Sequence, residues 1–166
     1  MLDPQKIKLY LSLFKGLELN DFANIFKLVR IKRLAPLQVY ISEGATHRKI
    51  AYIKEGLIRA YAINEKSDEI TTLVRWEDQV IASYDNILFN QPSRFVYEAI
   101  EPTVLLELDY DIAQSFAKKN PKIEQARRHF LTKMLGEALT RVETFVLLTP
   151  QERYVDFNWN NNAKHN

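Results

Sequence analysis

The spacing of apolar residues changes twice along the chain and divides it into a helical start, a β-rich middle and a helical end. In the start, apolar residues recur at i, i+3, i+4 and i+7, which predicts an amphipathic helix. The residues that carry this period are Ile7, Tyr10, Leu11 and Phe14. We expect this helix to begin after Asp3-Pro4 and to end at Gly16. Asn20 can then cap a second short helix that carries Phe22, Ile25 and Phe26.

From Val29 to about Leu108 the helical period gives way to short segments in which apolar residues alternate with others. Such segments, separated by turn-like stretches, are typical of antiparallel strands in a sandwich or barrel. The alternating residues are Val29/Ile31, Val39/Ile41, Leu57/Arg59/Tyr61/Ile63, Ile70/Thr72/Val74/Trp76, Phe95/Tyr97/Ala99 and residues 104–108. The stretch "NEKSDE" predicts a hairpin loop, and Gly44 and Gly56 stand at segment edges, where a strand must turn.

The helical period returns at Asp109, with a short helix expected to about Lys119. Asn120-Pro121 then starts a long helix that ends near Leu148. At ~1.5 Å per residue, its ~28 residues span roughly 40 Å. That length exceeds what packing on a small barrel needs, so we expect the helix to pack against a partner besides its own barrel.

Apolar residues on the long helix are spaced 4, 3, 4 and 3, which is the spacing of a coiled-coil seam. The seam residues are Leu131, Leu135, Ala138, Val142 and Phe145. Phe130 and Met134 lie beside the seam and can face the barrel, which makes the apolar surface too wide for one neighbour. We therefore expect a homodimer. The alternative is a single amphipathic helix packed on its own domain.

Composition narrows the class of protein. The 166 residues are 46% hydrophobic, which is enough for one domain plus an appendage. Without cysteine, neither a disulfide nor a thiolate metal site can form. The N-terminal stretch does not resemble a signal peptide and no run approaches the ~18 to 20 apolar residues of a membrane span, so we expect a cytoplasmic protein without a membrane partner. The net charge of +2 gives no strong footprint for nucleic acid.

Two stretches carry a resemblance to a known family. "FKLVRIKRLAPLQVYISEGATHRKIAYIKEGLIRAYAINEKSDEITTLVRW" holds Gly44 and the "AYIKEGLIRAY" strand pair, and "EPTVLLELDYDIAQSF" precedes the Asn-Pro of the long helix. In this order they resemble the CRP/FNR family of transcription regulators. The resemblance implies a mainly β fold with flanking helices: a double-stranded β-helix (jelly roll) of the cyclic-nucleotide-binding type, followed by a long dimerisation helix. Its segments are the jelly roll with N-terminal helices over 1–119, the dimerisation helix over 120–148, and the remainder over 149–166.

The remainder opens with a helix signal. Thr149-Pro150-Gln151-Glu152 offers a capping hydroxyl, Pro at the first helical position and Glu three residues past the cap. The resemblance places the hinge and first helix of a winged helix-turn-helix on "LTPQERYVDF", so 149–166 resemble the stub of a DNA-binding domain. We therefore expect no sequence-specific DNA binding unless a partner or a longer chain supplies a complete winged-helix domain.

The resemblance also locates the ligand cassette. Family members that bind cyclic nucleotides hold the phosphate with a Gly-Glu pair and an Arg-Ser/Thr-Ala run, positions that fall on Ala82-Ser83 and Ser93-Arg94-Phe95. The carboxylate is missing, Ser replaces Arg and Phe replaces the small Ala, although a slip of one residue would put Arg94 at the phosphate. The base-contacting hydroxyl pair falls on Ala138 and Leu139. The sequence therefore argues against cyclic AMP or cyclic GMP as the ligand.

Two interpretations of the cassette stay open. The first is a site for another small-molecule effector, and the second is a degenerate pocket whose residues pack or are solvated. The residues concerned are Ser83, Tyr84, Ser93, Arg94 and Tyr97. The function predicted from the sequence is a homodimeric CRP/FNR-type sensor domain. Its rival is an interaction module that acts through a full-length partner.

Enzymatic function is not expected. A jelly roll also serves cupin-like metal enzymes, but these need two or three histidines with a carboxylate. His47, His129 and His165 form no pair at ligand spacing, so no metal or other cofactor is predicted. No nucleophile elbow, phosphate loop or paired-carboxylate pattern occurs, and we predict no catalytic residue. The basic residues of the strands and of the long helix are interpreted as solvated surface: Lys27, Arg30, Lys32, Arg33, Arg127, Arg128 and Arg141.

Overall fold

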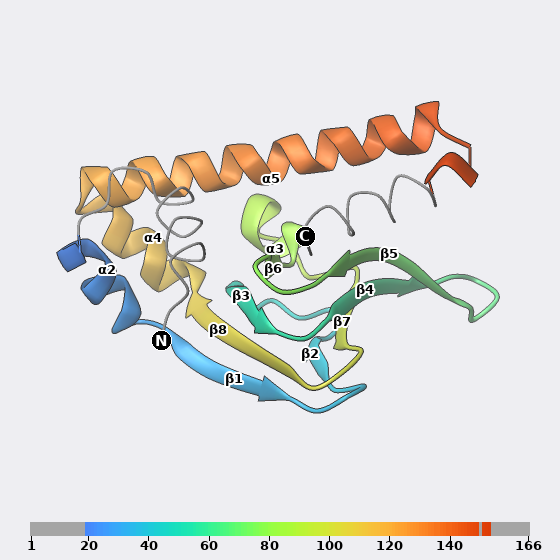
Figure 1. Ribbon diagram of the computed structural model, residues 1–166, viewed down its shortest axis with the longest axis horizontal. Helices are drawn as coiled ribbons and strands as arrows, with labels where there is room; N and C mark the ends of the chain where they lie inside the picture. Colours follow the sequence, from blue (N-terminus) through green and yellow to red (C-terminus); the bar gives the residue numbers. More distant parts are fainter. Residues whose placement is uncertain (1–18, 150, 154–166) are drawn as a thin grey trace, which may run out of the picture. The chain divides into compact units, whose positions relative to one another are not determined.

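The computed structural model describes residues 19–149 and 151–153, which belong to two compact units (Figure 1). One unit holds the strands and ends at Pro121, and the other begins at Lys122 and holds most of the long helix. The helix predicted after Asp3-Pro4 and the chain after Arg153 lie outside the described residues.

In the described part of the chain, eight strands form two antiparallel sheets of four strands each. The first sheet has the order β1 (Arg30–Leu34), β8 (Thr103–Asp109), β3 (Lys49–Glu55) and β6 (Val80–Ala82). The second has the order β2 (Val39–Ile41), β7 (Val96–Ala99), β4 (Ile58–Ile63) and β5 (Glu69–Arg75). The pairs β1–β8, β2–β7, β3–β6 and β4–β5 are those of a long hairpin rolled onto itself. The predicted double-stranded β-helix is confirmed.

The core is built from strands of both sheets. Because side chains alternate across a strand, every second residue points to the inside. The buried core residues are Leu34, Ile41, Ala51, Ile53, Ile58, Ala60, Ile81, Tyr97, Ala99 and Leu105. Most are aliphatic, and together they hold the two sheets face to face through the hydrophobic effect.

In two strands the alternating residues named from the sequence are not the main core row. On β1 Ile31 is 67% exposed, and Leu34, in the opposite row, is buried. On β4 the core row is Ile58 and Ala60 rather than the row that starts at Leu57, and a bulge after Ala60 lets Tyr61 be buried as well. Both strands carry apolar residues in each row, so alternation alone could not decide which row faces inward.

The predicted turns are confirmed. Gly44 and Gly56 have φ values of +77° and +97°, a region that L side chains rarely adopt. The hairpin between β4 and β5 is closed by Asn64, whose side-chain oxygen accepts hydrogen bonds from the amides of Lys66 and Asp68, each at 2.9 Å. This is the local side-chain to backbone bonding that favours Asn in turns.

Helices flank the sheets along the chain (Figure 1). The described helices are α2 (Leu19–Phe26), α3 (Tyr84–Phe89), α4 (Tyr110–Lys118) and α5 (Pro121–Leu147). Asn20 lies inside α2, so its predicted capping role is wrong. Asp109 caps α4 by accepting from the amides of Asp111 and Ile112, and α5 starts at Pro121 as predicted.

The helix signal after α5 is also confirmed. The Thr149 amide donates to Glu152 Oε2 at 2.8 Å, and the Glu152 amide donates back to the Thr149 hydroxyl at 3.4 Å. This reciprocal pair is a capping box. Hydrogen bonds from the Thr149 amide and the Thr149 hydroxyl lower the pKa of Glu152, and the bond from the amide has the larger effect.

Candidate functional site

The segment between β6 and β7 brings together the residues predicted to hold a ligand. Ser83 caps α3, since its hydroxyl accepts a hydrogen bond from the Asn86 amide at 3.4 Å. The Ser93 hydroxyl donates to the Phe95 carbonyl at 2.8 Å. Both serines are buried. Their hydroxyls therefore shape the backbone of this segment.

The two tyrosines of the predicted site have different surroundings. Tyr97, on β7, belongs to the buried core, and burial is the main cause that raises its pKa to about 12. A hydrogen bond with Ser83 opposes this shift, and the negative charge of Asp85 adds to it. Tyr84, the first residue of α3, is half-buried and receives a hydrogen bond from Arg75 at 3.3 Å.

An ion pair joins Asp85 of α3 to Arg94, which precedes β7. Arg94 donates from Nε to Asp85 Oδ1 at 3.0 Å, its Nη2 lies 2.8 Å from the same oxygen, and its amide donates to Asp85 Oδ2 at 3.0 Å. These hydrogen bonds and the negative charge of Asp85 raise the pKa of Arg94. The Asp85 side chain is 4% exposed and that of Arg94 is 73% exposed. The charge of Arg94 is thus matched within the segment itself.

Arg48, which the sequence did not single out, joins α3 to α4. Its guanidinium donates to the carbonyl oxygens of Asn86 at 3.0 Å and Ile87 at 3.2 Å, and to Asp111 Oδ1 at 2.6 Å. It also lies 4.8 Å from the centre of the Tyr110 ring. The partners of Arg48 lie 38 to 63 residues away in the chain, so no local pattern could have revealed them. Asp85 and Arg94 are nine residues apart, on either side of an irregular segment that follows no helical or strand period.

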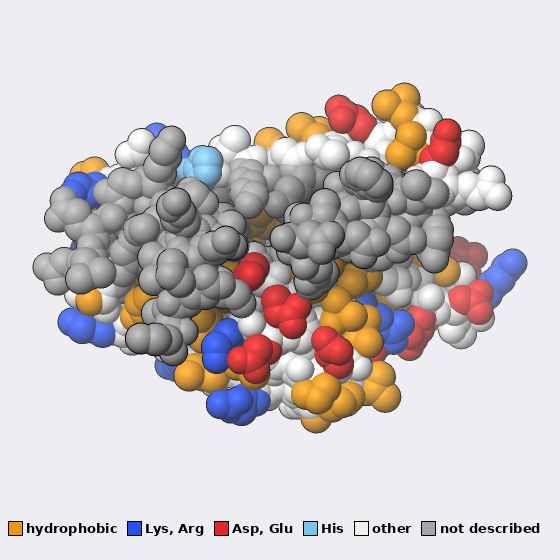
Figure 2. All heavy atoms as spheres, in the orientation of Figure 1, with side chains coloured by type: hydrophobic (Ala, Val, Ile, Leu, Met, Phe, Trp, Pro, Cys, Tyr) orange, Lys and Arg blue, Asp and Glu red, His pale blue; other side chains and the backbone are white. Residues whose placement is uncertain are grey.

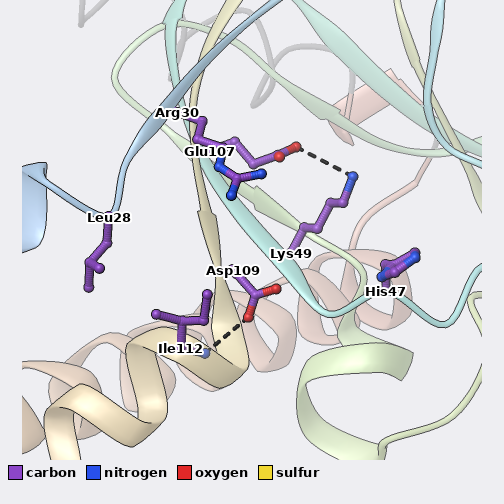
Figure 3. Close-up of a pocket in the computed structure, with 7 residues that line it drawn as sticks. All are labelled: Leu28, Arg30, His47, Lys49, Glu107, Asp109 and Ile112. Carbon is purple, nitrogen blue, oxygen red and sulfur yellow. Dashed lines mark hydrogen bonds and ion pairs between the residues drawn. The ribbon is translucent and has the colours of Figure 1, made fainter.

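A pocket of about 300 Å³ opens in the strand-containing unit (Figure 3). It is lined by Leu28, Arg30, His47, Lys49, Glu107, Asp109 and Ile112. None of the five residues predicted to hold a ligand contributes to this lining. Arg30 was interpreted as solvated surface and His47 was considered only as a metal ligand, while the remaining five carried no signal in the sequence.

The long helix presents the other predicted interface. Leu135, Val142 and Phe145 are each more than half exposed, while Leu131 and Ala138 are half-buried. Leu139 and Val146, which the predicted seam did not include, are also more than half exposed, and they widen the apolar stripe. Figure 2 shows hydrophobic side chains at the surface toward the C-terminal end of α5. Met134 is buried, and the side chain of Phe130 lies outside the described part.

Metal-binding and membrane-spanning features are absent from the residues that the structure describes. No group of three or more His, Asp or Glu side chains within 19–149 and 151–153 could hold a metal ion. His47 and His129 are exposed, and His165 is not among the described residues. No described helix is long and apolar enough to cross a membrane.

Sequence comparison relates the chain to bacterial regulators, although no family model matches. It is 27% identical over 131 residues to the regulatory protein HlyX of Actinobacillus pleuropneumoniae, which is 79% of this chain and 51% of that protein. It is 29% identical over 132 residues to the anaerobic regulatory protein of Haemophilus influenzae, with 80% and 49% covered. The chain spans about half the length of the curated relatives it matches. Both relatives are named as regulators.

Structure comparison shows the fold that these regulators share. The sensor domain of the transcriptional regulator DNR from Pseudomonas aeruginosa superposes with a TM-score of 0.65 at 15% identity, covering 84% of this chain and 95% of that domain. The catabolite activator protein of Thermus thermophilus gives a TM-score of 0.65 at 16% identity, covering 81% and 62%. The chain carries a CRP/FNR-type cyclic-nucleotide-binding-like domain. The sequence resemblance that implied this family is confirmed.

In this CRP/FNR-type domain the segment between β6 and β7 contains the short helix α3. The side chains at the positions that the resemblance assigns to phosphate binding are of other types. Ser83, at the position that the resemblance assigns to the Glu of the Gly-Glu pair, caps α3. Arg94, the residue that a one-residue slip would place at the phosphate, is held by Asp85 through two side-chain contacts and one amide. The aromatic ring of Phe95 packs against the core.

Proposed function

We propose that this chain is the sensor part of a homodimeric CRP/FNR-type transcription regulator. The observation that carries the proposal is the apolar stripe of α5. Its residues recur with the 3.5-residue period of a coiled coil, and five of them stay more than half exposed: Leu135, Leu139, Val142, Phe145 and Val146. A second copy that presents the same stripe would bury both faces.

Two cations border the C-terminal end of the stripe. The Arg153 guanidinium lies 4.7 Å from the centre of the Phe145 ring and that of Arg141 lies 5.9 Å from it. Arg153 follows the capping box of Thr149 and Glu152, so the turn after α5 is tied to the end of the stripe. In a dimer this connection would transmit a change in how the helices meet to whatever domain follows.

Native mass spectrometry of the chain tests the dimer. The wild type is expected as a dimer, and the double variant Leu135→Glu with Val142→Glu as a monomer, because four like charges would then face one another in the seam. Thr140→Glu is the matched control, since Thr140 lies on the opposite side of the helix and is exposed. A monomeric wild type, or a double variant that stays dimeric, would refute the proposal.

We also propose that this sensor domain binds neither cyclic AMP nor cyclic GMP. The buried carboxylate of Asp85 would repel a phosphate, and the nearest guanidinium, that of Arg94, is already paired with it. Isothermal titration with cyclic AMP and with cyclic GMP is expected to show no saturable heat. Saturable binding that is lost in Arg94→Gln would contradict this part of the proposal.

Another effector at the cassette is the second candidate. The Asn86 side-chain oxygen is buried without a hydrogen-bond partner in the described part of the chain, although its nitrogen donates to Ala45 and Gln91. A ligand held by Ser83, Tyr84, Ser93, Arg94 and Tyr97 would have to open the Asp85–Arg94 pair. A crystal structure of protein purified without dialysis would show such a ligand in place of that pair, whereas an intact pair with no added density would exclude it.

The output of the regulator is proposed to need a winged-helix domain from a longer chain or a partner. Among the side chains that Figure 2 colours by type, acidic and basic ones are interspersed and form no continuous basic surface, which fits the net charge of +2. A gel-shift titration of the present chain with promoter DNA is therefore expected to show no sequence-selective complex. Tight selective binding would overturn this expectation, and co-purification of a DNA-binding partner would support it.

A further inference from the structure

The inside of the roll changes from apolar to charged toward one end of the first sheet. Three neighbouring strands each follow this course: Leu34, Lys32 and Arg30 on β1; Ile53, Ala51 and Lys49 on β3; Leu105, Glu107 and Asp109 on β8. The apolar residues Leu34, Ala51, Ile53 and Leu105 belong to the core, so these rows face inward. The charged ends of the rows line the pocket of about 300 Å³ (Figure 3).

The charges of this pocket are arranged by strand. The carboxylates of Glu107 and Asp109 come from the central strand β8, and cations come from the strands on both sides, Arg30 from β1 and Lys49 from β3. Arg30 lies opposite Glu107, and Lys49 lies opposite Asp109 in the ladder. Acid and base are therefore alternated across the pocket rather than gathered into one anionic or cationic patch.

Polar groups in the pocket are left incompletely paired. Lys49 Nζ lies 3.7 Å from Glu107 Oε2, which is too far for a hydrogen bond, and this buried oxygen accepts no hydrogen bond of normal geometry in the described part of the chain. Within the same part, neither Arg30 nor His47 forms an ion pair. Burial, and then the charge of Glu107, raises the pKa of Tyr40, whose hydroxyl lies near Glu107 without a hydrogen bond of normal geometry.

The remaining wall is apolar. Leu28 follows α2, and Ile112 stands in the first turn of α4; both line the pocket beside Asp109 (Figure 3). One oxygen of Asp109 is used to cap α4, accepting from the amides of Asp111 and Ile112. A ligand in this pocket thus meets charges of both signs on the strands and a hydrocarbon surface on one side.

We infer that this pocket binds a small α-amino acid with an apolar side chain. The ammonium group would pair with the Glu107 carboxylate, the ligand carboxylate would pair with Arg30 and Lys49, and the ligand side chain would pack on Leu28 and Ile112. A simple carboxylate would face two acidic groups and a simple amine two basic ones, whereas a zwitterion satisfies both. The volume is at the lower end of small-molecule sites, which suits a ligand of this size.

Three molecules of similar shape test the inference on the present chain by isothermal titration. L-leucine has both charges, 4-methylpentanoate has only the carboxylate and 3-methylbutylamine has only the ammonium group. L-leucine, L-valine, L-isoleucine and L-methionine form the ligand panel. At least one of the four is expected to bind saturably with a Kd of about 1 mM or tighter, with each single-charge analogue of leucine weaker than leucine itself. Absence of saturable binding for all four would overturn the inference.

Variants locate the site. Glu107→Gln and Arg30→Gln are each expected to weaken amino-acid binding at least about tenfold, because each removes a charged hydrogen-bond partner. The controls are Glu101→Gln and Arg33→Gln, exposed residues that do not line the pocket and should leave the affinity unchanged. Circular dichroism spectra equal to the wild type establish that the variants are folded. Binding that is equally strong in folded Glu107→Gln and Arg30→Gln would place the ligand elsewhere and refute the inference.

Discussion

At the scale of the residue, the two glycines at strand edges have the same backbone conformation and different surroundings. A Cβ at Gly56 would clash with the Thr103 hydroxyl and lie 2.6 Å from the Pro102 carbonyl oxygen, whereas at Gly44 nothing lies within 4 Å. Gly44 therefore matters for its φ of +77° alone. Gly56 also permits a close approach of backbone to the start of β8, where the Thr103 hydroxyl accepts from the Leu57 amide.

The glycine pair gives a stability prediction. Gly44→Ala is expected to lower the free energy of unfolding by about 1 kcal/mol, the usual cost of a positive φ for an L residue. Gly56→Ala should lower it by about 3 kcal/mol or more, since Thr103 and the backbone must also move. Urea unfolding followed by circular dichroism measures both. Equal losses in the two variants would show that the contact with Thr103 has no energetic weight.

At the scale of the element, α5 is a long helix with one glycine in its interior. Gly136 is exposed, nothing within 4 Å would meet a Cβ there, and it lies four residues before Thr140, on the side of the helix away from the proposed seam. Gly136→Ala is therefore expected to stabilise α5 by about 1 kcal/mol, because Gly loses more backbone entropy than Ala in a helix. An increase in thermal midpoint without a change in oligomeric mass would agree with this, and a loss of the dimer would place Gly136 in the interface.

Elements with strong local signals were predictable from the sequence, and those without were not. The start of α5 at Pro121, the hairpin at Asn64 and the capping box of Thr149 and Glu152 each depend on residues close in sequence, which is why they were predicted correctly. β3 was indicated by the family resemblance, because its apolar residues did not stand out by alternation. The short β6 carried no separate signal, and the inward row of β1 could not be assigned because both of its rows contain apolar residues.

At the scale of the whole strand-containing unit, buried phenols make stability depend on alkaline pH. Burial raises the pKa of Tyr97 from 10.0 to about 12 in the folded state. The folded state therefore favours the neutral phenol, and this contribution is complete below pH 10 and is lost between pH 10 and about pH 12. The loss amounts to roughly 3 kcal/mol for the rise of the Tyr97 pKa from 10.0 to about 12.

Urea unfolding at a series of alkaline pH values measures this effect. The free energy of unfolding of the wild type is expected to fall steeply above pH 10. In Tyr97→Phe the fall should be shallower over the same range, because one titrating group is gone. A wild-type stability that is constant from pH 10 to 12 would contradict the environment that the structure gives to Tyr97.

The sequence by itself determined the order of the elements, the turns, the long helix with its apolar spacing and, through resemblance, the CRP/FNR-type fold. These features follow from residues near one another in the chain, where propensity, capping and period act directly. Only the tertiary structure decided that Asp85 pairs with Arg94, that Arg48 joins α3 to α4, and that charged residues of β1, β3 and β8 meet around one pocket. The contacts of Arg48 and the lining of the pocket join residues that are distant in sequence. The energies of these contacts and of the Asp85–Arg94 pair depend on burial and on partners that exist only once the sheets have formed.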